Sequence, residues 1–149
     1  MNISDFKYAI LEYTRKINEN TNKSFNPVFA EYGLTMLQGR ILMELFHFGR
    51  LSIGNLAESI NAAGANVSAM CKKLEKMGYL YRFRDKEDER VVQVDLTEKG
   101  REILLKINGK LNELISREFS REGEEAFYEI IRGLDKLNKI LERIVSLNQ

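Results

Sequence analysis

Residues 52–96 read SIGNLAESINAAGANVSAMCKKLEKMGYLYRFRDKEDERVVQVDL. Ser52 is a favourable N-cap residue, and it precedes a short apolar stripe at helical spacing that ends at Ile60. Asn61 follows, and asparagine tolerates the left-handed backbone conformation that a sharp turn between helices requires. A second helix is predicted over residues 65–77. Two short helices joined by such a turn are typical of a helix-turn-helix.

The predicted helix over residues 65–77 has two different faces. Its apolar stripe, which we expect to hold the helix to the rest of the domain, consists of Val67, Met70, Cys71 and Leu74. The opposite face is small, polar and basic, as in a recognition helix that enters the major groove. We expect Asn66, Ser68 and Ala69 to approach base edges, and Lys72 and Lys73 to meet phosphates.

The segment after Gly78 predicts a β-hairpin. Residues 79–84 alternate aromatic or aliphatic side chains with arginines, residues 91–96 read as the returning strand, and the charged tip lies between them. A hairpin at this place is the wing of a winged helix-turn-helix. Arg90 suits insertion into a narrow minor groove, and Asp88 can orient it. The full set of predicted DNA-binding residues is Ser52, Ala65, Asn66, Ser68, Ala69, Lys72, Lys73, Arg84, Lys86, Asp88 and Arg90.

Long helices are predicted on both sides of this segment. The first starts near Ser4, and at Pro27 it either breaks or continues as a bent helix to Glu31. A capping box at residues 35–38 starts the next helix. After residue 97 two long amphipathic helices follow, separated near Gly123. The fold is therefore predicted to be mainly α with a small β-hairpin, in one domain over residues 1–149, with a DNA-binding lobe at 35–100 and dimerisation helices at 1–31 and 101–149.

The composition narrows the classes of function. With 44% hydrophobic and 30% charged residues the chain is typical of a soluble globular protein, and the first six residues lack a secretory signal pattern, so we expect a cytoplasmic protein. With one cysteine and one histidine, the chain has few side chains that could bind a metal or act as a nucleophile. We therefore expect that it binds no metal or cofactor and is not an enzyme. Net charge is only +1, and residues 63–90 carry seven basic against five acidic side chains. Charge alone is therefore a weak indication of DNA binding.

Three short motifs carry a resemblance to a known family. They are LEKMG at residues 74–78, DER at 88–90 and LTEKG at 96–100. With the order of the predicted helices, they resemble the multiple antibiotic resistance regulator (MarR) family across essentially the whole chain. The resemblance implies a winged-helix regulator of transcription, a repressor as the common case, whose first and last helices interlock in a homodimer on double-stranded DNA. It also implies that Arg90 is the arginine that enters the minor groove and that Asp88 is its partner in the wing.

The sequence departs from that family at two places and leaves several alternatives open. Ala63 stands where a capping serine or threonine is common, and Ala69 where a basic or polar residue is common. Cys71 is either a packed small hydrophobe or a redox-sensing thiol. A helix-turn-helix also serves in protein-interaction adaptors. The family often binds aromatic acids or phenols, and the candidate residues for such a pocket, which are otherwise core, are Tyr13, Phe29, Tyr32, Phe46 and His47.

Overall fold

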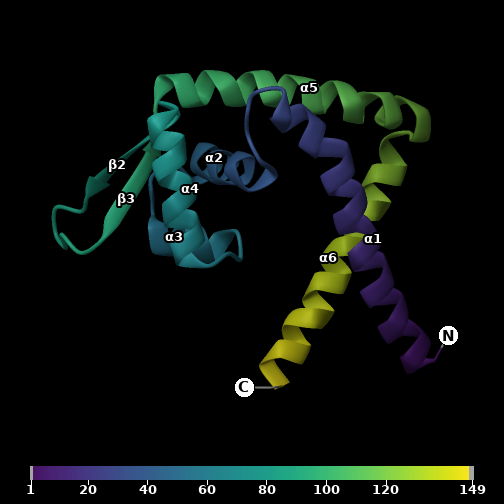
Figure 1. The fold of residues 1–149 in the computed structure, drawn as a ribbon. Helices are drawn as coiled ribbons and strands as arrows, with labels where there is room; N and C mark the ends of the chain where they lie inside the picture. Colours follow the sequence, from purple (N-terminus) through teal and green to yellow (C-terminus); the bar gives the residue numbers. More distant parts are fainter. Residues whose placement is uncertain (1, 148–149) are drawn as a thin grey trace. The chain divides into compact units, whose positions relative to one another are not determined.

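The computed structural model describes residues 2–147, which form helices and one small sheet (Figure 1). Residues up to Gly109 form one compact unit, and residues from Lys110 onward form a second. In chain order the elements are α1 (Ile3–Ala30), α2 (Met36–Phe48), β1 (Leu51–Ser52), α3 (Ile53–Ser59), α4 (Gly64–Lys76), β2 (Leu80–Arg84), β3 (Val92–Leu96), α5 (Glu98–Glu122) and α6 (Glu124–Leu147).

Helix α1 does not break at its proline. Asn2 caps it in a capping box with Asp5, and the helix continues through Pro27 to Ala30. Of the two alternatives that the sequence left open, the continued helix is confirmed. Pro27 removes only one backbone donor, and the buried side chains of Val28 and Phe29, which follow it, hold the last turn against the lobe.

The lobe is built on α2, α3 and α4. Thr35 and Gln38 form the predicted capping box at the start of α2, with backbone-to-side-chain distances of 2.8 and 3.2 Å. Asn61 adopts the left-handed conformation between α3 and α4, with φ of 51°. The side chains that these helices bury form one apolar core, which includes Ile41, Leu42, Leu45, Leu56, Ile60, Val67 and Leu74.

The sheet has one more strand than the sequence predicted. The hairpin of β2 and β3 is confirmed, with Leu80 opposite Leu96 and Arg84 opposite Val92. The two-residue strand β1 pairs with the other edge of β3, so the antiparallel order is β1-β3-β2. A strand of two residues is too short for an alternating pattern, so periodicity could not reveal it.

The second unit comprises the last part of α5 and all of α6. Gly123, at φ of 84°, separates these helices at the place that the sequence predicted. No residue of α6 is buried among those described, although its apolar stripe is long. Ile131, for example, keeps 63% of its surface exposed. The stripe therefore lacks a covering partner within its own unit.

No helix within residues 2–147 is long and apolar enough to cross a membrane.

Gly39 provides a test of how the lobe holds the end of α1. A Cβ atom at this position would overlap the ring of Phe29. We expect Gly39→Ala to lower the free energy of unfolding by about 1–3 kcal/mol, because an overpacked core forces the ring or the helix to shift. Urea denaturation at a fixed protein concentration measures the change.

The matched control is Gly54→Ala in α3. Its Cβ would meet only the Oγ atom of Ser52, at 3.8 Å. Alanine is preferred over glycine inside a helix, so this variant should gain about 0.5–1 kcal/mol. A Gly39→Ala protein as stable as the wild type would contradict the packing described here.

Candidate nucleic-acid interface

The two faces of α4 are arranged as the sequence predicted. Val67, Cys71 and Leu74 are fully buried, whereas Met70 is only half-buried. Ser68 is half-buried on the outer side, and the remaining predicted contact residues are exposed, namely Ala65, Asn66, Ala69, Lys72 and Lys73. Ala63 makes no side-chain cap at the start of the helix, so the first backbone amides are left open. The exposed face therefore carries small and polar side chains near the N-terminal end of α4 and lysines nearer its C-terminal end.

The wing tip is ordered by Asp85, which sequence reasoning did not select. Its Oδ1 atom accepts from the backbone amides of Glu87 and Asp88 at 2.8 and 3.3 Å, and its Oδ2 atom accepts from Gln93 Nε2 at 3.0 Å. These hydrogen bonds lower the pKa of Asp85 below its ordinary value, and the bond from the Glu87 amide has the largest effect. An aspartate at the start of a polar turn is a known turn-forming pattern and could have indicated this role.

Arg90 is held by Asp88 while it remains in solvent. Asp88 Oδ1 accepts from the backbone amide and from Nε of Arg90, each at 3.0 Å, and Oδ2 accepts from Nη2 at 3.1 Å. The Arg90 side chain is nevertheless 91% exposed. The side-chain bonds from Arg90 lower the pKa of Asp88, so this carboxylate stays charged at neutral pH. The guanidinium is thus restrained but open to a partner.

The other predicted contact residues have different surroundings. Arg84 is exposed and donates from Nη1 to the carbonyl oxygen of Glu89 at 3.0 Å, while Lys86 is exposed at the tip. The hydroxyl of Ser52 accepts from the backbone amide of Asn55 at 3.0 Å as the N-cap of α3. Ser52 therefore has a structural role in addition to any contact with DNA.

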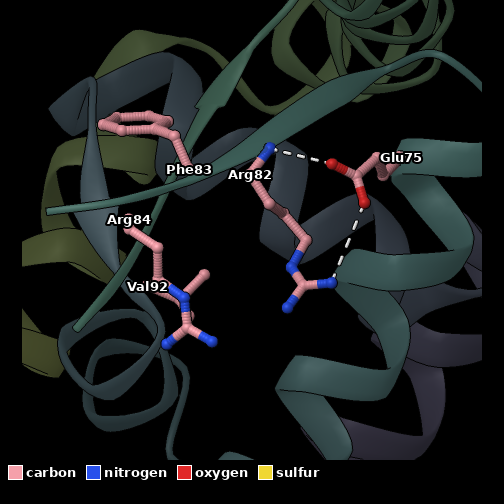
Figure 2. A pocket seen from close by; sticks show the side chains of 5 residues that line it. All are labelled: Glu75, Arg82, Phe83, Arg84 and Val92. Carbon is pink, nitrogen blue, oxygen red and sulfur yellow. Dashed lines mark hydrogen bonds and ion pairs between the residues drawn. The ribbon is translucent and has the colours of Figure 1, made fainter. Parts of the chain in front are cut away.

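A polar hollow lies between α4 and the wing strands. It has a volume of about 230 Å³ and is lined by Glu75, Arg82, Phe83, Arg84 and Val92 (Figure 2). Glu75 Oε1 accepts from the backbone amide of Arg82 at 3.0 Å, and its Oε2 lies 3.8 Å from Nη1 of Arg82. Glu75 therefore connects the recognition helix to β2. The sequence did not indicate the pairing of Glu75 with Arg82, because the two residues lie on different elements that a turn separates.

The comparisons with known proteins agree with this architecture. The family model described as the transcriptional regulator SarA/Rot matches residues 23–107, which is more than half of the chain. The chain belongs to the SarA/Rot family of transcriptional regulators. The matched range includes the whole lobe and the wing.

Individual relatives of this SarA/Rot protein include the HTH-type transcriptional regulator SarZ of Staphylococcus epidermidis. It is 32% identical over 103 residues, which cover 69% of each chain. The solved structure of the transcriptional regulator BldR from Sulfolobus solfataricus has a TM-score of 0.80 at 32% identity, and covers 96% of this chain and 99% of that one. The MepR–DNA complex of Staphylococcus aureus matches 86% of this chain and 95% of that one, with a TM-score of 0.74. At 22% identity that last likeness concerns the fold.

Two sequence predictions are thereby confirmed. The resemblance to the MarR family predicted a winged-helix regulator of transcription, and the matched family and structures are of that type. The relatives are regulators of transcription and not enzymes, as the residue content predicted.

Cys71 of this SarA/Rot protein lies in the core. It is fully buried on the inner face of α4, and burial raises the pKa of its thiol to about 11. A thiol with a raised pKa holds little of the thiolate that reacts with oxidants. The structure thus favours packing over sensing for this residue. Within residues 2–147, no group of three or more histidine, cysteine or acidic side chains is placed to hold a metal ion.

The predicted ligand-binding residues are spread over the first unit. Phe29 is fully buried in the core beside Gly39, whereas Tyr13 lies 16 residues earlier on α1, about 24 Å away along the helix axis. Phe46 and His47 are exposed at the end of α2, where His47 contacts Phe48 edge-on, and Tyr32 is half-buried. Phe29 is thus a core residue rather than an open pocket wall. A ligand site at the remaining residues stays a prediction.

The thiol of Cys71 gives a direct chemical test. At pH 8 we expect iodoacetamide to modify the folded protein about a hundredfold more slowly than the unfolded protein, because a thiol with a pKa of about 11 holds about a hundredfold less thiolate at that pH than an ordinary cysteine does. Mass spectrometry with and without urea follows the modification. Equal rates in the two states would place Cys71 at the surface.

Proposed function

We propose that this chain is a homodimeric regulator that binds a specific pseudo-palindromic DNA site and represses transcription from it. In this proposal α4 enters the major groove and the wing reaches the adjacent minor groove. The observation that carries the proposal is the restrained and exposed guanidinium of Arg90, together with a recognition helix whose buried stripe leaves small, polar and charged side chains outside, lysines among them. The family membership and the DNA complex of MepR support it.

Most of the predicted contact residues have a distinct role in this proposal. Lys72, Lys73 and Lys86 meet backbone phosphates, which supply affinity without reading sequence. Asn66 and Ser68 contact base edges, while Ala65 and Ala69 allow a close approach of the helix. Arg90 senses the width and negative potential of the minor groove. Such a protein acts where the chromosome lies, which in the bacteria and archaea that hold the relatives is the cytoplasm.

The dimer in this proposal is formed by the apolar faces of the helices within residues 1–31 and 101–149. α1 exposes large apolar side chains that include Ile3, Tyr8 and Leu11, and α6 exposes most of its stripe. Exposed apolar area of this extent is typical of a protein-protein interface. A two-fold axis would place two copies of α4 in successive major grooves, with half-sites about one helical turn apart.

Control by a small aromatic or phenolic ligand completes the proposal. The fixed spacing of the two half-sites allows tight binding at only one separation of the two recognition helices. A ligand that binds more tightly to a conformation with a different separation would therefore release the DNA. The exposed rings of Tyr13, Phe46 and His47 are the available aromatic surface for such a ligand. The buried thiol of Cys71 makes redox control a weaker alternative.

The role of Arg90 is tested by Arg90→Ala. We expect a loss of about tenfold to a hundredfold in affinity for a duplex that the wild-type protein selects from random-sequence DNA, since a specific arginine contact contributes on this scale. Asp88→Ala should cause a smaller loss, because the guanidinium remains but is no longer oriented. Fluorescence anisotropy at moderate salt measures both.

The control for the wing variants is Arg101→Ala in the first turn of α5, which removes the same charge outside the proposed interface. It should bind like the wild type. An unchanged dissociation constant for Arg90→Ala would count against the wing, and intact partner binding without any DNA binding would favour an adaptor instead.

The dimer is tested by Ile131→Glu in α6. A carboxylate in the middle of a buried apolar interface is strongly unfavourable, so we expect a monomer by sedimentation velocity and a loss of specific DNA binding. Glu129→Gln, an exposed neighbour on the same helix, should leave the dimer intact. A wild-type protein that sediments as a monomer at micromolar concentration would refute this part of the proposal.

A further inference from the structure

The hollow between α4 and the wing contains two guanidinium groups. Arg82 and Arg84 are alternate residues of β2, so their side chains leave the strand on the same face. Figure 2 shows both groups on the side of the strand that faces Glu75, with the ring of Phe83 pointing away from them. The hollow of about 230 Å³ is large enough for a group of several heavy atoms.

The charges around the hollow are unequal. Glu75 supplies one carboxylate, which lies 3.8 Å from Nη1 of Arg82. Arg84 donates to the carbonyl oxygen of Glu89, which carries no formal charge. Two positive groups and one negative group leave an excess of one positive charge. The hollow is thus suited to a single anion.

Arg82 also has an unused donor. Its Nε atom is buried and has no hydrogen-bond partner among residues 2–147. A buried N–H group without a partner is unfavourable, and such a group in a native structure calls for an acceptor. A rotation of the Arg82 side chain toward the hollow would bring this group to an anion there, and guanidinium groups bind tetrahedral oxyanions through paired hydrogen bonds.

We propose that this hollow seats one backbone phosphate of bound DNA, held jointly by Arg82 and Arg84. The proposal rests on the proposed function, which it deepens by naming a contact at the junction of the recognition helix and the wing. The location decides the source of the phosphate. The hollow lies between the two elements that are proposed to enter adjacent grooves, and the strand of the DNA backbone that separates those grooves passes between them.

Glu75 acts as a positioning residue at this seat. By accepting from the backbone amide of Arg82 and pairing with its side chain, it fixes the distance between α4 and β2. A phosphate bound there would set the register of the protein on the duplex, so that the base contacts of α4 and the minor-groove contact of Arg90 are made together.

The first measurement is the salt dependence of binding to the selected duplex. Each neutralised phosphate contributes about 0.9 to the slope of log affinity against log salt concentration. Because the two arginines share one phosphate, we expect the double variant Arg82→Gln, Arg84→Gln to lose about 0.9 in slope, and each single variant to lose less. Arg101→Gln is the charge-matched control and should keep the wild-type slope.

The second measurement identifies the phosphate. Neutral methylphosphonates are placed one position at a time along the duplex. We expect one position in each half-site at which the wild type loses affinity and the double variant does not, because the contact is already absent. A merely structural role for Arg82 would weaken binding at all positions and leave the pattern of sensitivity unchanged. Circular dichroism melts establish that each variant is folded.

Three outcomes would overturn the proposal. The double variant could keep the wild-type slope, or it could lose about 1.8, which indicates two separate phosphates. The double variant could also stay as sensitive as the wild type to every methylphosphonate position, which would show that the arginines contact no backbone phosphate. If the wild type selected no duplex from random-sequence DNA, the proposed function itself would be overturned. That failure would be seen at the selection step, before any variant is compared.

Discussion

The interface depends on one constraint, which is that α4 must bury one side to expose the other. Val67, Cys71 and Leu74 recur at helical spacing, and all three are fully buried. This burial fixes the rotation of the helix about its own axis, because turning it would bring lysines into the core and apolar groups into water. The rotation in turn determines which side chains face outward. The binding surface is thus set by side chains that no DNA would touch.

The wing is tied to the helix-turn-helix at the residues that precede α3 and at those that follow α4. β3 pairs with β1, which immediately precedes α3, and with β2, which follows α4, so one strand links the entry and exit of the helix-turn-helix. Where β3 ends, the hydroxyl of Thr97 donates to the carbonyl of Gly78, just after α4, at 2.6 Å and accepts from the amide of Gly100 at the start of α5 at 3.0 Å. These short connections restrict how far the wing can move from α4. A rigid separation is what two adjacent grooves require.

The sequence predicted the elements better than it predicted the bonds between them. Helix bounds, the cap at Thr35, the turn at Asn61 and the faces of α4 follow from local periodicity and capping, which one segment contains in full. β1 was missed because two residues hold no pattern. Arg82 with Glu75 was missed because that pair depends on how two elements pack. The residue type of Phe29 left it open between a ligand pocket and the core, because its burial depends on the absence of a side chain at Gly39.

The weak net charge of the lobe has a structural reason that a count of charges hides. Of the five acidic residues between positions 63 and 90, Glu75 and Asp88 each bind an arginine, and Asp85 binds backbone amides of the wing tip. The charge of Asp88 restrains the guanidinium of Arg90, which remains on the surface. An arginine held in place loses less conformational entropy when it meets DNA than a free one does. Acidic residues within a DNA-binding surface can therefore favour binding, although they lower the net charge on which a sequence-level argument relies.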